Sequence, residues 1–242
     1  MDNLIKYSTE QLKQEVESIF NLDYLKQERA PIDSGEYKFN SFPGMRANHY
    51  LIKSSDSSDY FFGDFKNTEI ENFVKLVSNK LSELGLEDKG RYCFMTIDQG
   101  WVESGKTLRV EGWHLDGLQG DGVRVKKPAD FEFLWFDCLP TLFATQKFDI
   151  DGLNLSTHNI FNWLGKRVDS TKILETKPFR IYGINPYHVH RANEAKGRIY
   201  RRFIRLAYTY IPVTSVRMTV NPEMKYNYDY HTTSGEIPDY LK

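Results

Sequence analysis

The spacing of apolar residues changes along the chain from a helical to an alternating period. Over 8–27, apolar side chains recur at helical spacing behind a capping box, which predicts a first helix. A second helix is predicted over 68–84, with Thr68 as its N-cap and Gly85 as its stop signal. The stretch at 31–44 is rich in proline and glycine and is therefore predicted to be a loop.

Strands dominate the predicted structure after residue 90. Apolar and polar side chains alternate there, as they do on strands that bury one face. The predicted strands cover residues 91–97, 108–115, 131–136, 141–143, 173–184 and 199–211. The connection at 146–170 holds a short predicted helix over 159–164. Helices followed by strands predict a mainly β fold with N-terminal helices, built as a double-stranded β-helix, or jelly roll.

The length of 242 residues fits one domain, because β-sandwiches and barrels of this size often remain undivided. We expect a single domain over 1–242. Its expected parts are a helical support at about 1–90, a jelly-roll core at about 91–211 and a polar tail at about 212–242.

Composition narrows the range of partners and the expected location. The chain has 32 Lys and Arg against 33 Asp and Glu, a balance that argues against bulk binding to nucleic acid or to an anionic membrane. It shows no apolar run of membrane-spanning length and no signal-peptide stretch at its start. Cys93 and Cys138 lack metal-site spacing and are expected to be reduced thiols. These features predict a cytoplasmic protein with no membrane partner.

The pair His114 and Asp116 is the first candidate for chemistry. Residues i and i+2 of a strand point to the same face, so an imidazole and a carboxylate leave this segment side by side. Gly117, Gly120 and Gly122 follow the pair, which places it at the rim of a sheet where a site can open. Two histidines and one carboxylate leave three metal positions open, as in iron(II) oxygenases.

A second histidine for such a site is available in the segment Tyr187–Ala192. His188 and His190 share one face of an extended segment, so alternation does not choose between them. Either or both could instead be ordinary structural histidines.

Arginines are concentrated on the predicted strand that follows. Arg201 and Arg205 share one face and Arg202 lies on the other, while Arg198 precedes the strand. A buried strand tolerates arginine only when its charge is paired, and a ligand carboxylate is a natural partner because guanidinium binds it through two parallel hydrogen bonds. An exposed edge strand with solvated arginines is the alternative.

With these residues in place, 91–211 resembles the 2-oxoglutarate/iron(II) dioxygenase superfamily, in its taurine dioxygenase-like or phytanoyl hydroxylase-like branch. That family's pattern is His-x-Asp, a distal histidine and an arginine on the following strand. His190 stands 11 residues before Arg201 and 15 before Arg205, spacings similar to those of the taurine branch. Pro140-Thr141-Leu142-Phe143-Ala144 resembles that branch's Asp-Thr-Leu-Phe-Ala segment, with proline at its first position.

The resemblance implies a role for each matched residue. His114, Asp116 and His190 would bind Fe(II). Arg201 and Thr141 would hold the distal carboxylate of 2-oxoglutarate, and Arg205 would assist them or meet an anionic substrate. The implied reaction consumes O2 and 2-oxoglutarate, releases succinate and CO2, and hydroxylates the substrate. Related halogenases have a small residue in place of the aspartate, so Asp116 favours hydroxylation.

Other functions compete with this one. A cupin-like jelly roll that binds without catalysis would explain the strands. A zinc hydrolase would use the same ligand set but would leave the arginines unexplained. A base-modifying oxygenase is open because of the basic segment Arg124–Lys127, although the balanced charge disfavours nucleic acid. A small molecule, amino acid or peptide is the favoured substrate.

Overall fold

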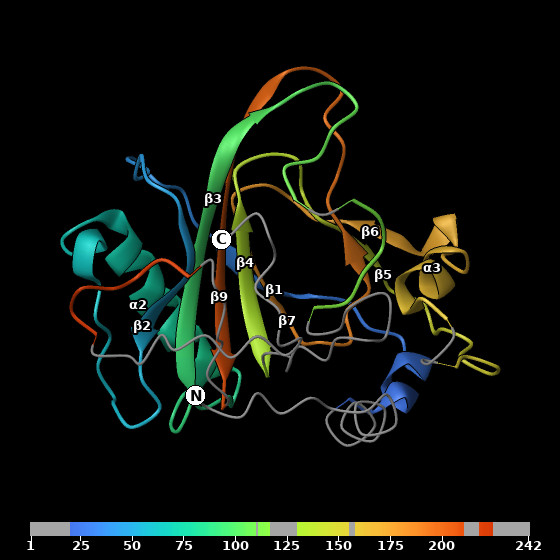
Figure 1. The fold of residues 1–242 in the computed structure, drawn as a ribbon, viewed down its shortest axis with the longest axis horizontal. Coiled ribbons are helices and arrows are strands. Elements are labelled where there is room, and N and C mark those ends of the chain that lie inside the picture. Colours follow the sequence, from blue (N-terminus) through green and yellow to red (C-terminus); the bar gives the residue numbers. More distant parts are fainter. Residues whose placement is uncertain (1–19, 110, 117–129, 155–157, 211–217, 225–242) are drawn as a thin grey trace, which may run out of the picture.

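Two antiparallel β-sheets form the body of the protein (Figure 1). The computed structural model describes residues 20–109, 111–116, 130–154, 158–210 and 218–224. The large sheet has the order β1-β7-β4-β9-β3-β2, with β1 at Ile32–Glu36, β2 at Ala47–Lys53, β3 at Tyr92–Val102, β4 at Phe131–Phe136, β7 at Arg180–Ile184 and β9 at Ile199–Thr209. The small sheet has the order β6-β5-β8, with β5 at Leu142–Ala144, β6 at Ile173–Glu175 and β8 at His190–Arg191.

Helices are few among the described residues. The α-helices are α2 at Glu69–Glu83 and α3 at Ile160–Gly165, and the 3-10 helices are η1 at Leu22–Lys26, η2 at Gly63–Phe65 and η3 at Ser170–Lys172. None of these helices is long and apolar enough to span a bilayer. Cys93 and Cys138 are both free. The fold is therefore mainly antiparallel β and compatible with a β-sandwich.

Three apolar clusters divide the molecule into layers. Helix α2 buries its apolar stripe against one face of the large sheet, where Ile204, Leu206 and Tyr208 of β9 meet it. The other face of the large sheet packs on the small sheet through Phe203 and Phe143. A third cluster lies beyond the small sheet and includes residues of η1 and α3. Figure 1 shows α2 and α3 at opposite sides of the two sheets.

Strand β9 has a different environment on each of its two faces. It lies between β3 and β4 in the large sheet, so both of its edges are hydrogen-bonded. Ile204 and its alternate neighbours face α2, whereas Arg201, Phe203 and Arg205 face the small sheet. The alternation of a strand thus directs two arginines into the space between the sheets.

Several predicted elements are confirmed. Helix α2 begins after Thr68, whose side chain accepts a hydrogen bond from the Ile70 backbone N–H, and Gly85 follows its end with a φ of +67°. The Glu71 carboxylate accepts a hydrogen bond from the backbone N–H of Asn67, the residue before the N-cap. The predicted short helix corresponds to α3, and the strands predicted at 131–136 and 199–211 correspond to β4 and β9.

The N-terminal predictions need correction. The prediction of one continuous helix over 8–27 is wrong at Asn21. Asn21 has an extended backbone, and its side chain accepts a hydrogen bond from the Asp23 N–H, so Asn21 is the N-cap of the separate helix η1. Residues 8–19 lie outside the described residues. The predicted loop at 31–44 contains β1, a largely exposed edge strand with no alternating pattern to reveal it. Strands β1 and β2 thus lie at the two edges of the large sheet, within the expected helical support.

Two strand predictions are also wrong. The described residues of 108–115 do not form a strand, because the Thr107 hydroxyl bonds the Arg109 carbonyl and Gly112 has a φ of +83°. Of these described residues, only His114 takes part in a β-bridge. The predicted strand 173–184 divides into β6 and β7, which belong to different sheets. The chain turns between them at Phe179, whose φ is +60°. The expected tail at about 212–242 lies largely outside the described residues.

Candidate metal centre

Two histidines from distant parts of the chain face each other between the sheets. The backbone N–H of His114 donates to the His190 carbonyl at 2.9 Å, and the N–H of His190 donates to the His114 carbonyl at 3.0 Å. This bridge adds the His114 segment to the edge of the small sheet beside β8. Directly opposed residues carry neighbouring side chains, and the ring centroids of the two histidines lie 4.4 Å apart.

Both imidazoles are oriented by a backbone carbonyl. His114 Nδ1 lies 3.0 Å from the Gly112 carbonyl oxygen, and His190 Nδ1 lies 2.8 Å from that of His188. A carbonyl oxygen only accepts, so each Nδ1 carries a proton, and each ring in its neutral form offers the lone pair of Nε2 to a metal. Burial, followed by the charge of His114, lowers the pKa of His190 to about 4. His190 is therefore neutral near pH 7, the state in which histidine binds a metal.

Asp116 completes the set on the same side. Leu115, between the two polar residues, is buried in the cluster beyond the small sheet. Asp116 Oδ2 lies 3.6 Å from His190 Nε2, and one ligand atom from each of His114, Asp116 and His190 lies within 4.8 Å of the others. Burial raises the pKa of Asp116, but His190 when it is protonated, Arg205 and His114 outweigh burial and hold this pKa well below the usual carboxyl range. Near pH 7, where His190 is neutral, the guanidinium of Arg205 still lies 3.6 Å from Asp116 Oδ1. Asp116 is therefore ionised, as a metal ligand must be.

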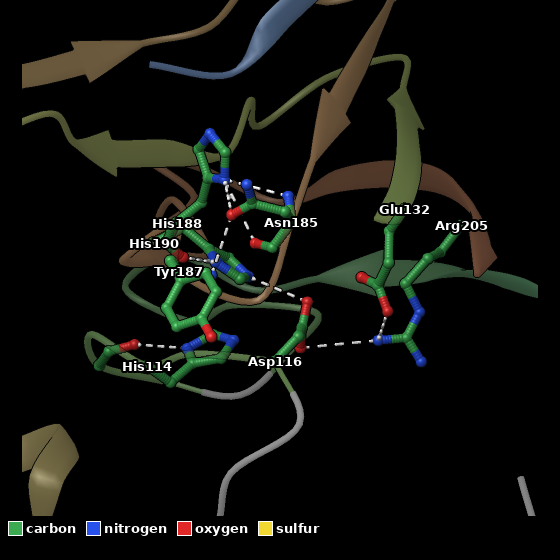
Figure 2. Close-up of polar contacts among 9 residues, drawn as sticks. His114, Asp116, Glu132, Asn185, Tyr187, His188, His190 and Arg205 are labelled. Atoms are coloured by element: carbon green, nitrogen blue, oxygen red, sulfur yellow. Dashed lines mark hydrogen bonds and ion pairs between the residues drawn. The ribbon is translucent and has the colours of Figure 1, made fainter. Parts of the chain in front are cut away.

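His188 is directed away from this group (Figure 2). Its Nε2 lies 3.1 Å from the Ala30 carbonyl oxygen, and its Nδ1 accepts a hydrogen bond from the Asn185 backbone N–H at 3.0 Å. Both ring nitrogens are therefore committed to the backbone. Of the two histidines that the sequence left open, the structure brings His190 to His114 and Asp116.

Arg201 is the most deeply buried arginine of the pocket beside the metal ligands. Its side chain is 2% exposed, and its guanidinium lies 5.2 Å from the centre of the Phe203 ring. Nε donates to the Cys138 carbonyl at 3.2 Å, but Nη1 is buried without a hydrogen-bond partner among the described residues. Burial, and then the charge of Arg109, lower the pKa of Arg201 to about 10, so it remains charged at pH 7.

The other predicted anchor residues fall into two groups. Thr141, which is 4% exposed, lines the pocket together with Arg201. Arg202 lies outside it, paired with Asp137 at 3.4 Å. Arg198 is exposed and pairs with Glu103 at 3.0 Å. Arg201 is therefore the arginine among these three that reaches the pocket.

Arg205 lies beside the metal ligands and contacts acidic side chains (Figure 2). Its Nη1 is 3.6 Å from Asp116 Oδ1 and 3.8 Å from Glu132 Oε1. Burial lowers the pKa of Arg205, but Glu132 and Asp116 outweigh it and raise the pKa above the ordinary value.

Sequence reasoning missed two residues of this region. Glu132 is a lone carboxylate in the otherwise apolar strand β4, and this contrast was a signal that it serves a buried cation. Arg109 lines the pocket, lies 4.9 Å from the centre of the Phe203 ring and pairs with Asp98 at 3.6 Å. No local pattern identifies Arg109, because it lies outside the regular strands of the structure.

Comparison with known proteins adds little to this geometry. No protein-family model matches the chain, and no curated protein matches it. Among solved structures, one match is the structure titled "Crystal Structure of EvdMO1", with 12% identity and a TM-score of 0.31. The match covers 87% of this chain and 46% of that one, so this chain spans less than half the length of its match.

Proposed function

We propose that this protein is a non-haem iron(II) oxygenase that uses 2-oxoglutarate and hydroxylates a small molecule, an amino acid or a peptide. One observation carries the proposal. His114, Asp116 and His190 present a two-histidine, one-carboxylate ligand set in a pocket that also holds Arg201, whose Nη1 has no hydrogen-bond partner in the described part of the chain. A metal site beside a buried cation fits a ligand that chelates the metal through one end and carries a second carboxylate at the other end.

The proposal includes the double-stranded β-helix as the finer description of the fold. The described chain passes from β4 in the large sheet to β5 and β6 in the small sheet, then to β7, β8 and β9, which alternate between the two. Together with β3 and the bridged segment at His114, these six strands give eight extended segments, which is the number of strands in a jelly roll.

The donor set fits iron(II). Among the described residues no carbonyl bonds the Nε2 atom of either histidine, and the low pKa of Asp116 keeps a carboxylate available. Two imidazoles and one carboxylate leave three coordination positions open. Iron(II), when bound there, supplies the activation of dioxygen that no side chain can provide.

The chain's own residues bind and orient the ligands. The Gly112 and His188 carbonyls fix the two imidazole rings. Arg201 holds the distal carboxylate of the keto acid, with Thr141 beside it in the pocket. Leu134 and Phe203 line the same pocket and exclude water from the reacting groups.

Anaerobic addition of iron(II) and 2-oxoglutarate tests the ligand set. We expect a visible metal-to-ligand charge-transfer band in the wild-type protein. His190→Ala should lose the band because it removes a ligand, whereas the matched variant His188→Ala should keep it. Absence of the band in folded wild-type protein, or equal loss in both variants, would contradict the proposal.

Turnover provides the second test. Succinate should form from 2-oxoglutarate in air, and candidate small molecules and peptides should increase its rate when one of them is the substrate. Hydrolysis of a substrate with zinc bound and without oxygen would favour the hydrolase instead.

A further inference from the structure

Arg205 lies between the carboxylate of the metal site and a second buried carboxylate. A single nitrogen, Nη1, lies 3.6 Å from Asp116 Oδ1 and 3.8 Å from Glu132 Oε1. The opposite oxygen of Asp116, Oδ2, is the one that faces His190 Nε2. The two oxygens of Asp116 thus have separate surroundings, one beside a cation and one beside the metal ligands (Figure 2).

The arginine and its second carboxylate are rigidly placed. Arg205 and Glu132 come from the adjacent strands β9 and β4, whose register sets Leu134 opposite Arg205 and Glu132 opposite Ala207. Arg205 is 8% exposed and Glu132 is 5% exposed. Strands in the middle of a sheet hold side chains more precisely than loops do. Asp116, in contrast, lies at the end of a described segment without regular structure.

We propose that Arg205, held by Glu132, is a positioning residue that engages Oδ1 of Asp116 and leaves Oδ2 as the single metal-binding oxygen. The inference rests on the proposed function. A carboxylate can bind a metal through one oxygen or through both. Arg205 favours one-oxygen binding, because its guanidinium competes with the metal for Oδ1. This keeps the third open coordination position of the site for a further ligand.

This positioning role of Arg205 differs from the role that the sequence predicted, which was contact with the keto acid or with an anionic substrate. The two roles are separable because positioning acts on the metal site before any keto acid is present. A measurement on the metal-loaded protein without 2-oxoglutarate therefore distinguishes them.

Manganese(II) provides that measurement, because the water molecules bound to it enhance the relaxation of solvent protons. Three open positions hold three waters, and binding of both Asp116 oxygens would remove one of them. We expect the relaxivity of protein-bound manganese(II) to fall by about one third in Arg205→Gln. Glu132→Leu should give a smaller fall, because it removes the carboxylate that pairs with Arg205 but leaves the guanidinium beside Asp116.

Arg202→Gln is the matched control on the opposite face of β9 and should leave the relaxivity unchanged. The double variant R205Q/E132L removes both buried charges and provides the same test if R205Q alone does not fold. Unchanged relaxivity in folded R205Q, or in the double variant, would overturn the inference. Failure of the wild-type protein to bind manganese(II) would instead contradict the proposed function.

Discussion

At the scale of single residues, the burial of Arg201 costs the protein free energy. A guanidinium removed from water needs partners for its donors, and among the described residues Nη1 has none. The Phe203 ring beneath it supplies a cation–π contact but accepts no conventional hydrogen bond. A bound carboxylate would satisfy both the charge and the unused donor.

This environment makes a specific binding prediction for Arg201. Arg201→Gln should weaken 2-oxoglutarate binding about a hundredfold, because a hydrogen-bonded charge contributes up to roughly 3 kcal/mol. Binding of 2-oxovalerate, which has the same chain length but no distal carboxylate, should change little. Calorimetric titration of the metal-loaded protein measures both affinities. Arg202→Gln is the control, and equal weakening for the two acids would contradict the assignment.

At the scale of elements, β9 combines two functions on its two faces. One face packs against α2 through Ile204, which is fully buried, and the other directs Arg201 and Arg205 into the pocket. A strand separates stability from ligand binding in this way because successive side chains point in opposite directions. Neighbouring positions on β9 should therefore give different phenotypes.

Ile204→Ala tests this separation. The variant should lower the free energy of unfolding by about 3 kcal/mol through the cavity it leaves under α2, while metal affinity stays unchanged. Urea denaturation measures the stability, and manganese(II) titration measures the affinity. Ile199→Ala makes the same chemical change at a position 36% exposed and should cost far less. A large loss of metal affinity in folded Ile204→Ala would show that the two faces are not independent.

At the scale of the whole molecule, the proposed metal ligands join segments that are far apart in the sequence. His114 and Asp116 come from the segment before β4, and His190 comes from β8. Their approach depends on the backbone bridge between His114 and His190 and on the packing of both sheets. An unfolded chain does not hold these three residues together, so the proposed metal binding would be coupled to folding.

Bound metal should therefore stabilise the fold. Manganese(II) at a hundred times its dissociation constant should add about 2.7 kcal/mol to the free energy of unfolding. Denaturation with and without the metal measures this increase. His190→Ala should show much less of it at the same metal concentration, and His188→Ala should keep it. Equal stabilisation of both variants would place the bound metal elsewhere.

Local patterns identified much of the candidate site but not its surroundings. The arginines of β9 are visible in the sequence because strand alternation is a local rule. The spacing of His114 to Asp116 is also visible, although the segment that carries it forms only a bridge at His114. Alternation did not choose between His188 and His190, and only the family resemblance pointed to His190. In the structure the choice depends on the Ala30 carbonyl and the Asn185 N–H that occupy His188. The failed strand at 108–115 shows the same limit, because the turn at Gly112 overrides alternation.

The sequence by itself determined helix α2 with its Thr68 cap, the main central strands and the residue types available for metal and carboxylate binding. These depend on contacts within a few residues, where spacing and side-chain chemistry suffice. Only the tertiary structure decided which histidine faces Asp116, which arginine enters the pocket, and that Glu132 meets Arg205. Those outcomes depend on strand pairing and sheet packing across the chain, which no local stretch of sequence encodes.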